Sequence, residues 1–315
     1  MHRPIRIAAA AAVIALAAPA LHAQAFPTRP IRLIVPYGPG ASTDIETRIY
    51  TQKLTEQTGQ PFVIDYKPGA GTTIGSAFVA RAAPDGYTIY AITGSFSTSA
   101  ALYPKLPYDV VKDFSHVCLI GHTPNVLIVP GDSPYKTLAD YIADAKAKPD
   151  QIAFGSSGIG SNTHLMGEYL GTLAGVKLKH VPYRGSAPAL QDLVAGNVDL
   201  FFDNLGVSLP LARDGKVKLL AVGTDKRLAS VPDTPTLIET LPDFVSSSWV
   251  GVFLPPKTPQ AIVRKLHEEI ARALNHPEFK NFILQQGSEP TVMGPEELGA
   301  FIRAEIEKWG KVVRQ

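Results

Sequence analysis

Glycine, serine and threonine gather in four short segments of the sequence, each of which follows an expected strand. The segments are residues 37–43, 93–98, 155–162 and 203–206. The first amide groups of a helix have no partner within the helix and carry about half a positive charge, so a carboxylate gains hydrogen bonds and a favourable field there. Small side chains let the backbone approach such an anion. The segments therefore predict a site for a small acid, although the same residues also occur in ordinary turns.

The candidate ligand-binding residues lie in these segments or directly after them. They are Tyr37, Gly40, Ala41, Ser42, Thr43, Ser95, Ser97, Thr98, Ser156, Ser157, Gly160, Ser161, Asn162, His164, Asp203 and Asn204. Asn204 offers both a donor and an acceptor. His164 either donates to a ligand oxygen or caps its own turn, and Asp203, an acid in a cleft for acids, more readily holds the neighbouring loop than a ligand. Arg184 more readily braces a hinge than pairs with a distal carboxylate, and Trp249 more readily joins the core than stacks on a ligand.

Sequence signatures of catalysis and of cofactor binding are missing. Residues 69–75 read Gly-x-Gly-x-x-x-Gly, one residue longer than the dinucleotide fingerprint, and no Walker sequence occurs. Ile159 replaces the last glycine of a Gly-x-Ser-x-Gly elbow. His267 has no second histidine one turn later, and no cluster of cysteine and histidine is expected. We expect no catalytic residue, no metal ion and no cofactor; the enzymatic alternative is an exported serine hydrolase that uses Ser157 with His164.

The composition excludes several classes of protein. At about 150 residues per domain, the 315 residues correspond to about two domains. A formal charge of +2 provides no basic surface for a polyanion, so we expect no nucleic-acid partner. With 45% hydrophobic residues the chain can bury a core, and 26 glycines and 27 prolines predict many turns. The single cysteine, Cys118, lies in an apolar run and is expected to be a buried, unreactive thiol.

The first 25 residues have the order of a secretory signal peptide. Arg3 and Arg6 precede an apolar run over residues 7–18, and the small-residue sequence Ala23-Gln24-Ala25 follows. The run is shorter than the roughly 20 residues of a membrane-spanning helix. We therefore expect cleavage after about Ala25 and a periplasmic protein, with a retained anchor as the alternative. Loss of both arginines brings the formal charge to zero, so an acid must be attracted by local dipoles.

Strands alternate with helices along the rest of the chain. The expected strands are residues 31–35, 62–65, 87–92, 151–154, 179–181, 198–202 and 249–254, and residues 116–130 form one long extended stretch. The expected helices are residues 43–58, 73–82, 136–148, 187–195, 259–275 and 295–313, with a short one after Thr98 and one more that ends at Leu173. This alternation predicts βαβ crossovers and a largely parallel sheet. Two similar α/β sets and a different tail are indicated.

Several segments carry a resemblance to a known family. They are residues 29–36, 67–71, 83–87, 102–108, 180–190, 202–204 and 302–309, which include Lys-Pro-Gly-Ala-Gly, His-Val-Pro-Tyr-Arg-Gly-Ser-Ala-Pro-Ala-Leu and Phe-Asp-Asn. In this order they resemble the Bug-type solute receptors of tripartite tricarboxylate transporters. The resemblance covers nearly all of the chain after the signal peptide.

The resemblance implies an α/β fold, that of a two-domain periplasmic binding protein of type II, or Venus flytrap, with a cleft between the domains. Residues 26–123 together with 250–315 form one discontinuous domain, and residues 124–249 form the inserted one. In such receptors, loop amides, hydroxyl groups and ordered water hold a carboxylate. On this chain that role falls to residues 37–43 and 156–164, with residues 95–98 and 203–204 around them.

The function expected from these observations is capture of a mono- or dicarboxylate, aliphatic or aromatic, by domain closure. The partners are the small carboxylate ligand and the membrane subunits of a secondary transporter, and the receptor is expected to be a monomer. A sensory receptor for a membrane signalling partner is the alternative. The family usually reads Pro-Phe-Pro-Pro-Gly-Gly where this chain has Pro36-Tyr37-Gly38-Pro39-Gly40-Ala41, so a relative's ligand does not transfer directly.

Overall fold

The computed structural model describes residues 26–39, 42–103, 105–242, 244, 246–285 and 289–314. The expected signal peptide, residues 1–25, and the candidate residues Gly40 and Ala41 lie outside the described residues, as does the side chain of Ser42. Within the described ranges, none of the helices combines the length and the apolar composition that a bilayer span requires.

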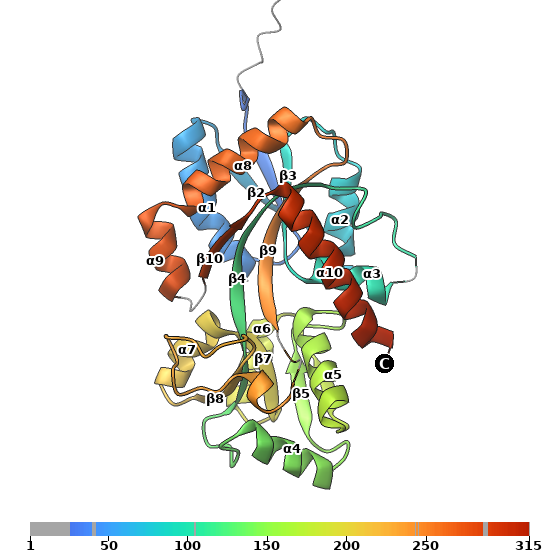
Figure 1. Ribbon diagram of the computed structural model, residues 1–315, viewed down its shortest axis with the longest axis vertical. Coiled ribbons are helices and arrows are strands. Elements are labelled where there is room, and N and C mark those ends of the chain that lie inside the picture. Colours follow the sequence, from blue (N-terminus) through green and yellow to red (C-terminus); the bar gives the residue numbers. More distant parts are fainter. Residues whose placement is uncertain are drawn as a thin grey trace, which may run out of the picture.

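Two groups of strands share one mixed sheet, one above the other in Figure 1. The strand order is β2-β1-β3-β9-β4-β7-β5-β6, and β8 and β10 also pair with β4. The first group consists of β1 (Ile31–Val35), β2 (Phe62–Tyr66), β3 (Thr88–Ile92), β10 (Glu289–Met293), β9 (Ser247–Leu254) and most of β4 (Ser115–Pro130). The second group consists of β5 (Ala153–Ser156), β6 (Lys179–Pro182), β7 (Leu200–Asn204), β8 (Val217–Val222) and the end of β4.

Parallel pairing occurs in the outer strands of each group. β1 is parallel to β2 and β3, and β5 is parallel to β6 and β7, as alternating strands and helices predict. β9 is antiparallel to β3 and β4, and β4 is antiparallel to β7, β8 and β10. The expectation of a largely parallel sheet is therefore wrong for its middle, because the chain crosses to the second group along β4 and returns along β9.

Strand β4 changes partners between Pro124 and Asn125. Residues up to Pro124 pair with β9, whereas Asn125 and its successors pair with β7 and β8. At this point Asn125 Nδ2 donates to Ser246 Oγ at 3.1 Å, so the two crossing segments are bonded to each other. The domain boundaries expected at residues 123 and 250 stay a prediction.

Apolar residues at helical spacing hold the helices against the sheet. In α8 (Gln260–Leu274), Val263, Leu266 and Ile270 are buried together with residues of β1 and β9. Cys118 lies in the same cluster, where burial raises the pKa of its thiol, so the prediction of a buried thiol is confirmed. The other helices include α1 (Ser42–Thr58), α2 (Thr73–Ala80), α3 (Ser95–Leu102), α4 (Leu138–Ala147), α5 (Asn162–Ala174), α6 (Ser186–Val194), α7 (Leu205–Arg213), α9 (Pro277–Gln285) and α10 (Pro295–Arg314).

Four elements are absent from the sequence prediction, namely α7, β8, α9 and β10. The expected loop at residues 203–206 is wrong in part, because α7 begins at Leu205. Gly206 and Pro210 both lie within α7, and both are poor helix formers, which hides the helix in the sequence. The helix forms nevertheless because it buries Leu205 and Leu209 in the core of the second group.

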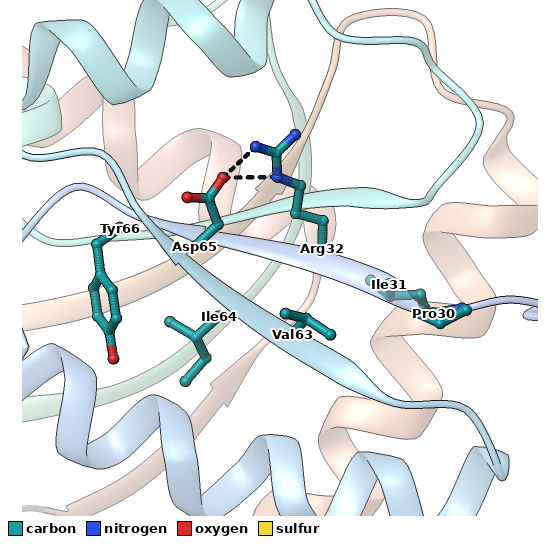
Figure 2. A pocket seen from close by; sticks show the side chains of 7 residues that line it. All are labelled: Pro30, Ile31, Arg32, Val63, Ile64, Asp65 and Tyr66. Atoms are coloured by element: carbon teal, nitrogen blue, oxygen red, sulfur yellow. Dashed lines mark hydrogen bonds and ion pairs between the residues drawn. The ribbon is translucent and has the colours of Figure 1, made fainter.

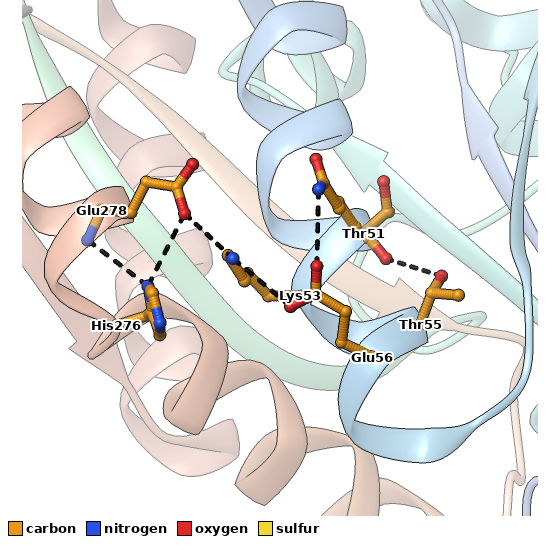
Figure 3. A network of polar contacts seen from close by, with 7 residues as sticks. Thr51, Lys53, Thr55, Glu56, His276 and Glu278 are labelled. Carbon is orange, nitrogen blue, oxygen red and sulfur yellow. Dashed lines mark hydrogen bonds and ion pairs between the residues drawn. The ribbon is translucent and has the colours of Figure 1, made fainter.

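An ion-pair network joins α9 to α1 (Figure 3). Lys53 of α1 lies 3.3 Å from Glu56 and 2.9 Å from Glu278 of α9, measured between the ammonium nitrogen and the carboxylate oxygens. His276 Nδ1, at the end of the connection from α8, accepts from the Glu278 amide at 3.4 Å. This network links α1 to the start of α9.

The C-terminal helix α10 touches both groups of strands. Leu298 and Ile302 are buried in a cluster with Phe253 of β9, whereas Trp309 is buried among residues of α5 and β5. The indole N–H groups of Trp249 and Trp309 both donate to Glu305 Oε2, at 3.1 and 3.0 Å. The tail thus packs on the first group, as expected, but its last turns also reach the second.

Replacement of Gly223 by alanine tests the close packing at the crossing. A Cβ at this position would lie 2.1 Å from the carbonyl oxygen of Ser246, which is backbone and cannot turn aside. We expect Gly223→Ala to lower the free energy of unfolding by about 1–3 kcal/mol in urea titrations. Gly38→Ala is the control, since a Cβ there meets no atom within 4 Å. Equal stability of both variants would contradict the tight crossing.

Candidate functional site

A cavity of ≈ 1040 Å³ lies between the two groups of strands. Its wall is formed by the segments that follow β1, β3, β5, β6 and β7, together with residues of β4 and β9. The candidate residues on the wall are Tyr37, Thr43, Ser95, Ser157, Ser161, Asn162, Asp203 and Asn204. Segments far apart in the sequence therefore meet around one space, in the cleft between the domains.

Several helices begin at this wall. Thr43 is the second residue of α1, Ser95 the first of α3 and Asn162 the first of α5. Ser186 is the first residue of α6, and Asn204 directly precedes α7. Because the first amides of a helix are unpaired and carry partial positive charge, the helix starts give the cavity a positive field that does not depend on charged side chains.

The wall on the first group is held by Tyr37 and its neighbours. The hydroxyl groups of Tyr37 and Thr93 are 2.6 Å apart and hydrogen-bonded. Desolvation raises the pKa of Tyr37, so its hydroxyl stays protonated at neutral pH. Thr43 and Ser95 are buried beside it and also line the cavity. The hydroxyl group of Tyr37 thus links the segment after β1 to the segment after β3.

The wall on the second group carries linked hydroxyl groups. Ser157 Oγ and Ser161 Oγ lie 2.9 and 3.0 Å from Thr163 Oγ1. Ser161 also caps α5, because its Oγ accepts from the His164 amide at 3.2 Å. These bonds preorganise the start of α5 and orient its hydroxyl groups at the cavity.

Asp203 is a buried acid on the cavity wall, with 2% of its surface exposed. Ser208 Oγ donates to Asp203 Oδ2 at 2.8 Å, which fits the expected structural role in holding the neighbouring segment. Burial raises the pKa of Asp203 to about 7, and the bond from Ser208 opposes that rise only in part. Around neutral pH, Asp203 therefore changes between a neutral and a charged form.

Some candidate residues lie behind the wall instead of on it. They are Ser97, Thr98, Ser156, Gly160 and His164. Ser97 and Thr98 turn inward in α3 and donate to the carbonyl groups of Gly94 and Ser95. His164 Nδ1 accepts from the Gly160 amide at 3.2 Å, so its imidazole braces its own turn. These residues support the wall and do not reach the cavity.

The wall also contains residues that the sequence does not single out. Asn125 and Ser248 lie inside the crossing strands β4 and β9, whereas Thr163 lies within the expected segment 156–164 but is not one of the candidate residues. Arg184 is exposed and lines the cavity. Trp249 is buried in the core, which is the position that the sequence favours over stacking on a ligand. A polar residue such as Asn125 within a long apolar strand is a signal of function, because a core position rarely keeps an amide.

His164, Glu168 and His180 form a cluster beside the site that the sequence does not predict. One ligand atom from each lies within 4.8 Å of the others, as in a site for a metal ion. His164 Nδ1 accepts a backbone hydrogen bond, so Nε2 of the neutral ring carries the proton and faces Glu168 Oε1 at 3.5 Å. The two imidazoles are also stacked, with centroids 4.1 Å apart. A metal ion would have to displace this arrangement.

A second hollow, of ≈ 580 Å³, lies along the edge strand β2 (Figure 2). Its cation, Arg32, donates through Nε to Asp65 Oδ2 at 2.7 Å, and the rest of the wall is largely apolar. None of the residues that line this hollow begins a helix. The features that favour an anion therefore belong to the larger cavity.

Comparison with known proteins agrees with this geometry. Residues 47–315 match the tripartite tricarboxylate transporter family receptor. The chain belongs to this family. The periplasmic binding protein BugD shares 34% identity with this receptor and has a TM-score of 0.84, with 92% of this chain and 98% of BugD covered. The receptor is thus of the Bug type and has the two-domain α/β fold of periplasmic binding proteins.

Two relatives with solved structures, both from Rhodopseudomonas palustris, contain carboxylates. Rpa4515 with adipate is 36% identical, with a TM-score of 0.86 over 92% of this chain and 97% of its own. MatC with bound malate is 34% identical, with a TM-score of 0.84 over 91% of this chain and 100% of its own. The family consists of solute receptors, and these two members hold small organic acids.

The partly buried His180 predicts a pH dependence of stability. Burial, and next the neighbouring His164, lower the pKa of His180 to about 4. An unfolded histidine titrates near about 6.5, so the unfolded state binds more protons between these values, and stability is lost as the pH falls from 6.5 toward 4. His180→Gln removes this titration and keeps a partner for Ser156, which lies 2.6 Å from His180 Nε2.

Urea titrations at about pH 7 and about pH 4.5 measure this effect. Because the ring is only partly buried, we expect the wild type to lose about 1–2 kcal/mol more than His180→Gln between these conditions. Parallel losses in both proteins would show that His180 does not carry the effect.

Proposed function

We propose that this protein is a periplasmic receptor that captures a small organic acid and delivers it to the membrane subunits of a tripartite tricarboxylate-type transporter. Capture occurs by closure of a domain of residues 26–123 and 250–315 on a domain of residues 124–249. The observation that carries the proposal is the convergence of the starts of α1, α3, α5, α6 and α7 on one cavity.

In this proposal uncharged donors hold the ligand carboxylate. Thr43 and Ser95 supply hydroxyl groups from the first group of strands, and Ser157, Ser161 and Asn162 supply polar groups from the second. Backbone amides at the starts of α1 and α5 add hydrogen bonds that grow stronger when closure excludes water. An acid bound to both walls links the two domains and stabilises the closed form by its differential affinity.

The hydrolase alternative loses support from the positions of the serines. Ser157, its expected nucleophile, is bonded to Thr163 and not to a histidine. The Ser156 hydroxyl does contact His180 Nε2 at 2.6 Å, but Ser156 is fully buried and lies outside the cavity wall. A pKa of about 4 also makes His180 a poor base at neutral pH. We therefore propose binding without catalysis.

The proposal is tested by calorimetric titration of the purified receptor with a panel of carboxylates. The panel contains adipate and malate, the acids held by the two relatives, together with aromatic and aliphatic monocarboxylates. We expect saturable binding of at least one acid, accompanied by a rise in melting temperature. An absence of heat and of thermal shift across the whole panel would refute the proposal.

Removal of the Thr43 hydroxyl is expected to weaken acid binding. A hydrogen bond to a charged group contributes about 1.5–3 kcal/mol, so Thr43→Val should raise the dissociation constant roughly ten- to a hundredfold. The control is Thr47→Val, one turn further along α1, where the side chain is fully buried away from the cavity. If both variants bind alike, Thr43 does not contact the ligand.

Ionisation of Asp203 is expected to make acid binding depend on pH. Below pH 7 the side chain is largely neutral, because its pKa is raised to about 7, and above it a negative charge faces the ligand. We expect affinity to fall by at most about tenfold per pH unit above pH 7, as one proton is linked to binding. Asp203→Asn keeps an acceptor for Ser208 and should bind equally from about pH 6 to 9. A similar decline in this variant would assign the effect to another group.

A further inference from the structure

The wall of the cavity changes from polar to apolar along two helices. Ala187, Leu190 and Val194 of α6 line the cavity, with Gln191 as the one polar residue of α6 among them after the helix start, and Val207 and Leu211 of α7 also line it. On each helix the apolar positions are three or four residues apart, so they form one continuous face. Each face begins beside the polar residues at the helix start and continues toward the helix end.

Large apolar side chains on this wall are exposed. Val194 and Val207 have 40% and 38% of their surface exposed, and Ile159, in the segment before α5, has 70%. Single exposed apolar residues are ordinary, but several around one cavity mark a place where an apolar group binds. Pro36 and Pro68 line the same cavity from the first group of strands. Both domains thus offer apolar surface to a ligand.

The charged groups of the wall are distributed unevenly. Arg184 lies directly before the start of α6, at the same end as the polar residues. Lys216 follows the end of α7, and its ammonium group is 3.9 Å from the carboxylate of Asp214. A carboxylate therefore meets helix starts and a guanidinium at one end, whereas the cation at the other end already has a partner.

We infer that the acid bound in this cavity is a monocarboxylate with an extended apolar body. Its carboxylate lies at the helix starts, and its body lies along α6 and α7. At 1.5 Å per residue, the stretch from Ala187 to Val194 is about 10 Å long, which sets the length of the body. This inference rests on the proposed function and names the class of acid for the same cavity.

A dicarboxylate of equal length fits the wall less well. Its second carboxylate would be brought against Val194, Val207 and Leu211, which offer no donor. Of the two neighbouring donors on the wall, Gln191 is uncharged and Lys216 is already paired with Asp214. Octanoate and suberate make this comparison directly, because both have the same number of carbon atoms and differ in the distal group. We expect the full-length receptor to bind octanoate at least about tenfold more tightly than suberate in calorimetric titrations.

Val207→Thr tests whether the apolar wall makes this distinction. The change keeps the shape of the side chain and replaces one methyl group by a hydroxyl, so we expect octanoate to bind about fourfold more weakly and suberate to change less. Val63→Thr is the matched control, because Val63 is an exposed valine of β2 outside the cavity. It should leave the affinity for both acids unchanged.

Three results would overturn the inference. If suberate binds as tightly as octanoate and Lys216→Met removes that affinity, the outer end takes a second carboxylate. If Val207→Thr weakens octanoate, suberate and malate equally, the apolar wall serves domain closure and not the ligand body. Binding of malate without binding of octanoate refutes this inference alone, whereas failure of every acid to bind refutes the proposed function.

Discussion

Strand β4 is hydrogen-bonded to both groups of strands, and the position of the cavity depends on this continuity. Up to Pro124 the strand belongs to the first group, and from Asn125 onward it belongs to the second. The carboxyl ends of β1, β3, β5 and β7 all open toward the crossing, since the residues after them line one cavity. Helices that follow these strands must then begin there, as in other open α/β sheets. The backbone topology alone thus places a positive field in the cavity, whatever the side chains are.

The side chains adjust this field more than they generate it. Hydroxyl groups on Ser157, Ser161 and Thr163 bond to one another and hold the start of α5 ready. Asp203 lies among the helix starts as a carboxyl group whose charge is suppressed by burial. A near-neutral chain can therefore attract an acid, because the relevant charge is local and carried by the backbone. Such donors are directed at one point and do not require a compensating ion pair.

The sequence predicts the strand-end segments well because glycine, serine and threonine have a physical reason to lie there. It does not reveal which hydroxyl groups face the cavity: Ser95 lines the cavity, whereas Ser97 turns back to the carbonyl of Gly94. In the sequence, Val194 and Val207 look like ordinary core residues, because only the tertiary arrangement leaves their side chains exposed. His164 and His180 lie in contact because α5 packs beside β6. The spacing of the two histidines in the sequence does not predict this contact.

The shared acceptor Glu305 has a consequence for how far the two domains can move apart. One carboxylate oxygen accepts from Trp249 on the crossing strand and from Trp309 near the end of α10. The ring of Trp309 is buried against the second group, although α10 is anchored on the first through Leu298 and Ile302. If the cleft opened so far that Trp309 left the second group, its indole ring would be exposed to water. In the proposed motion of the two domains, the C-terminal helix would therefore limit how far the cleft opens, although it lies outside the cavity wall.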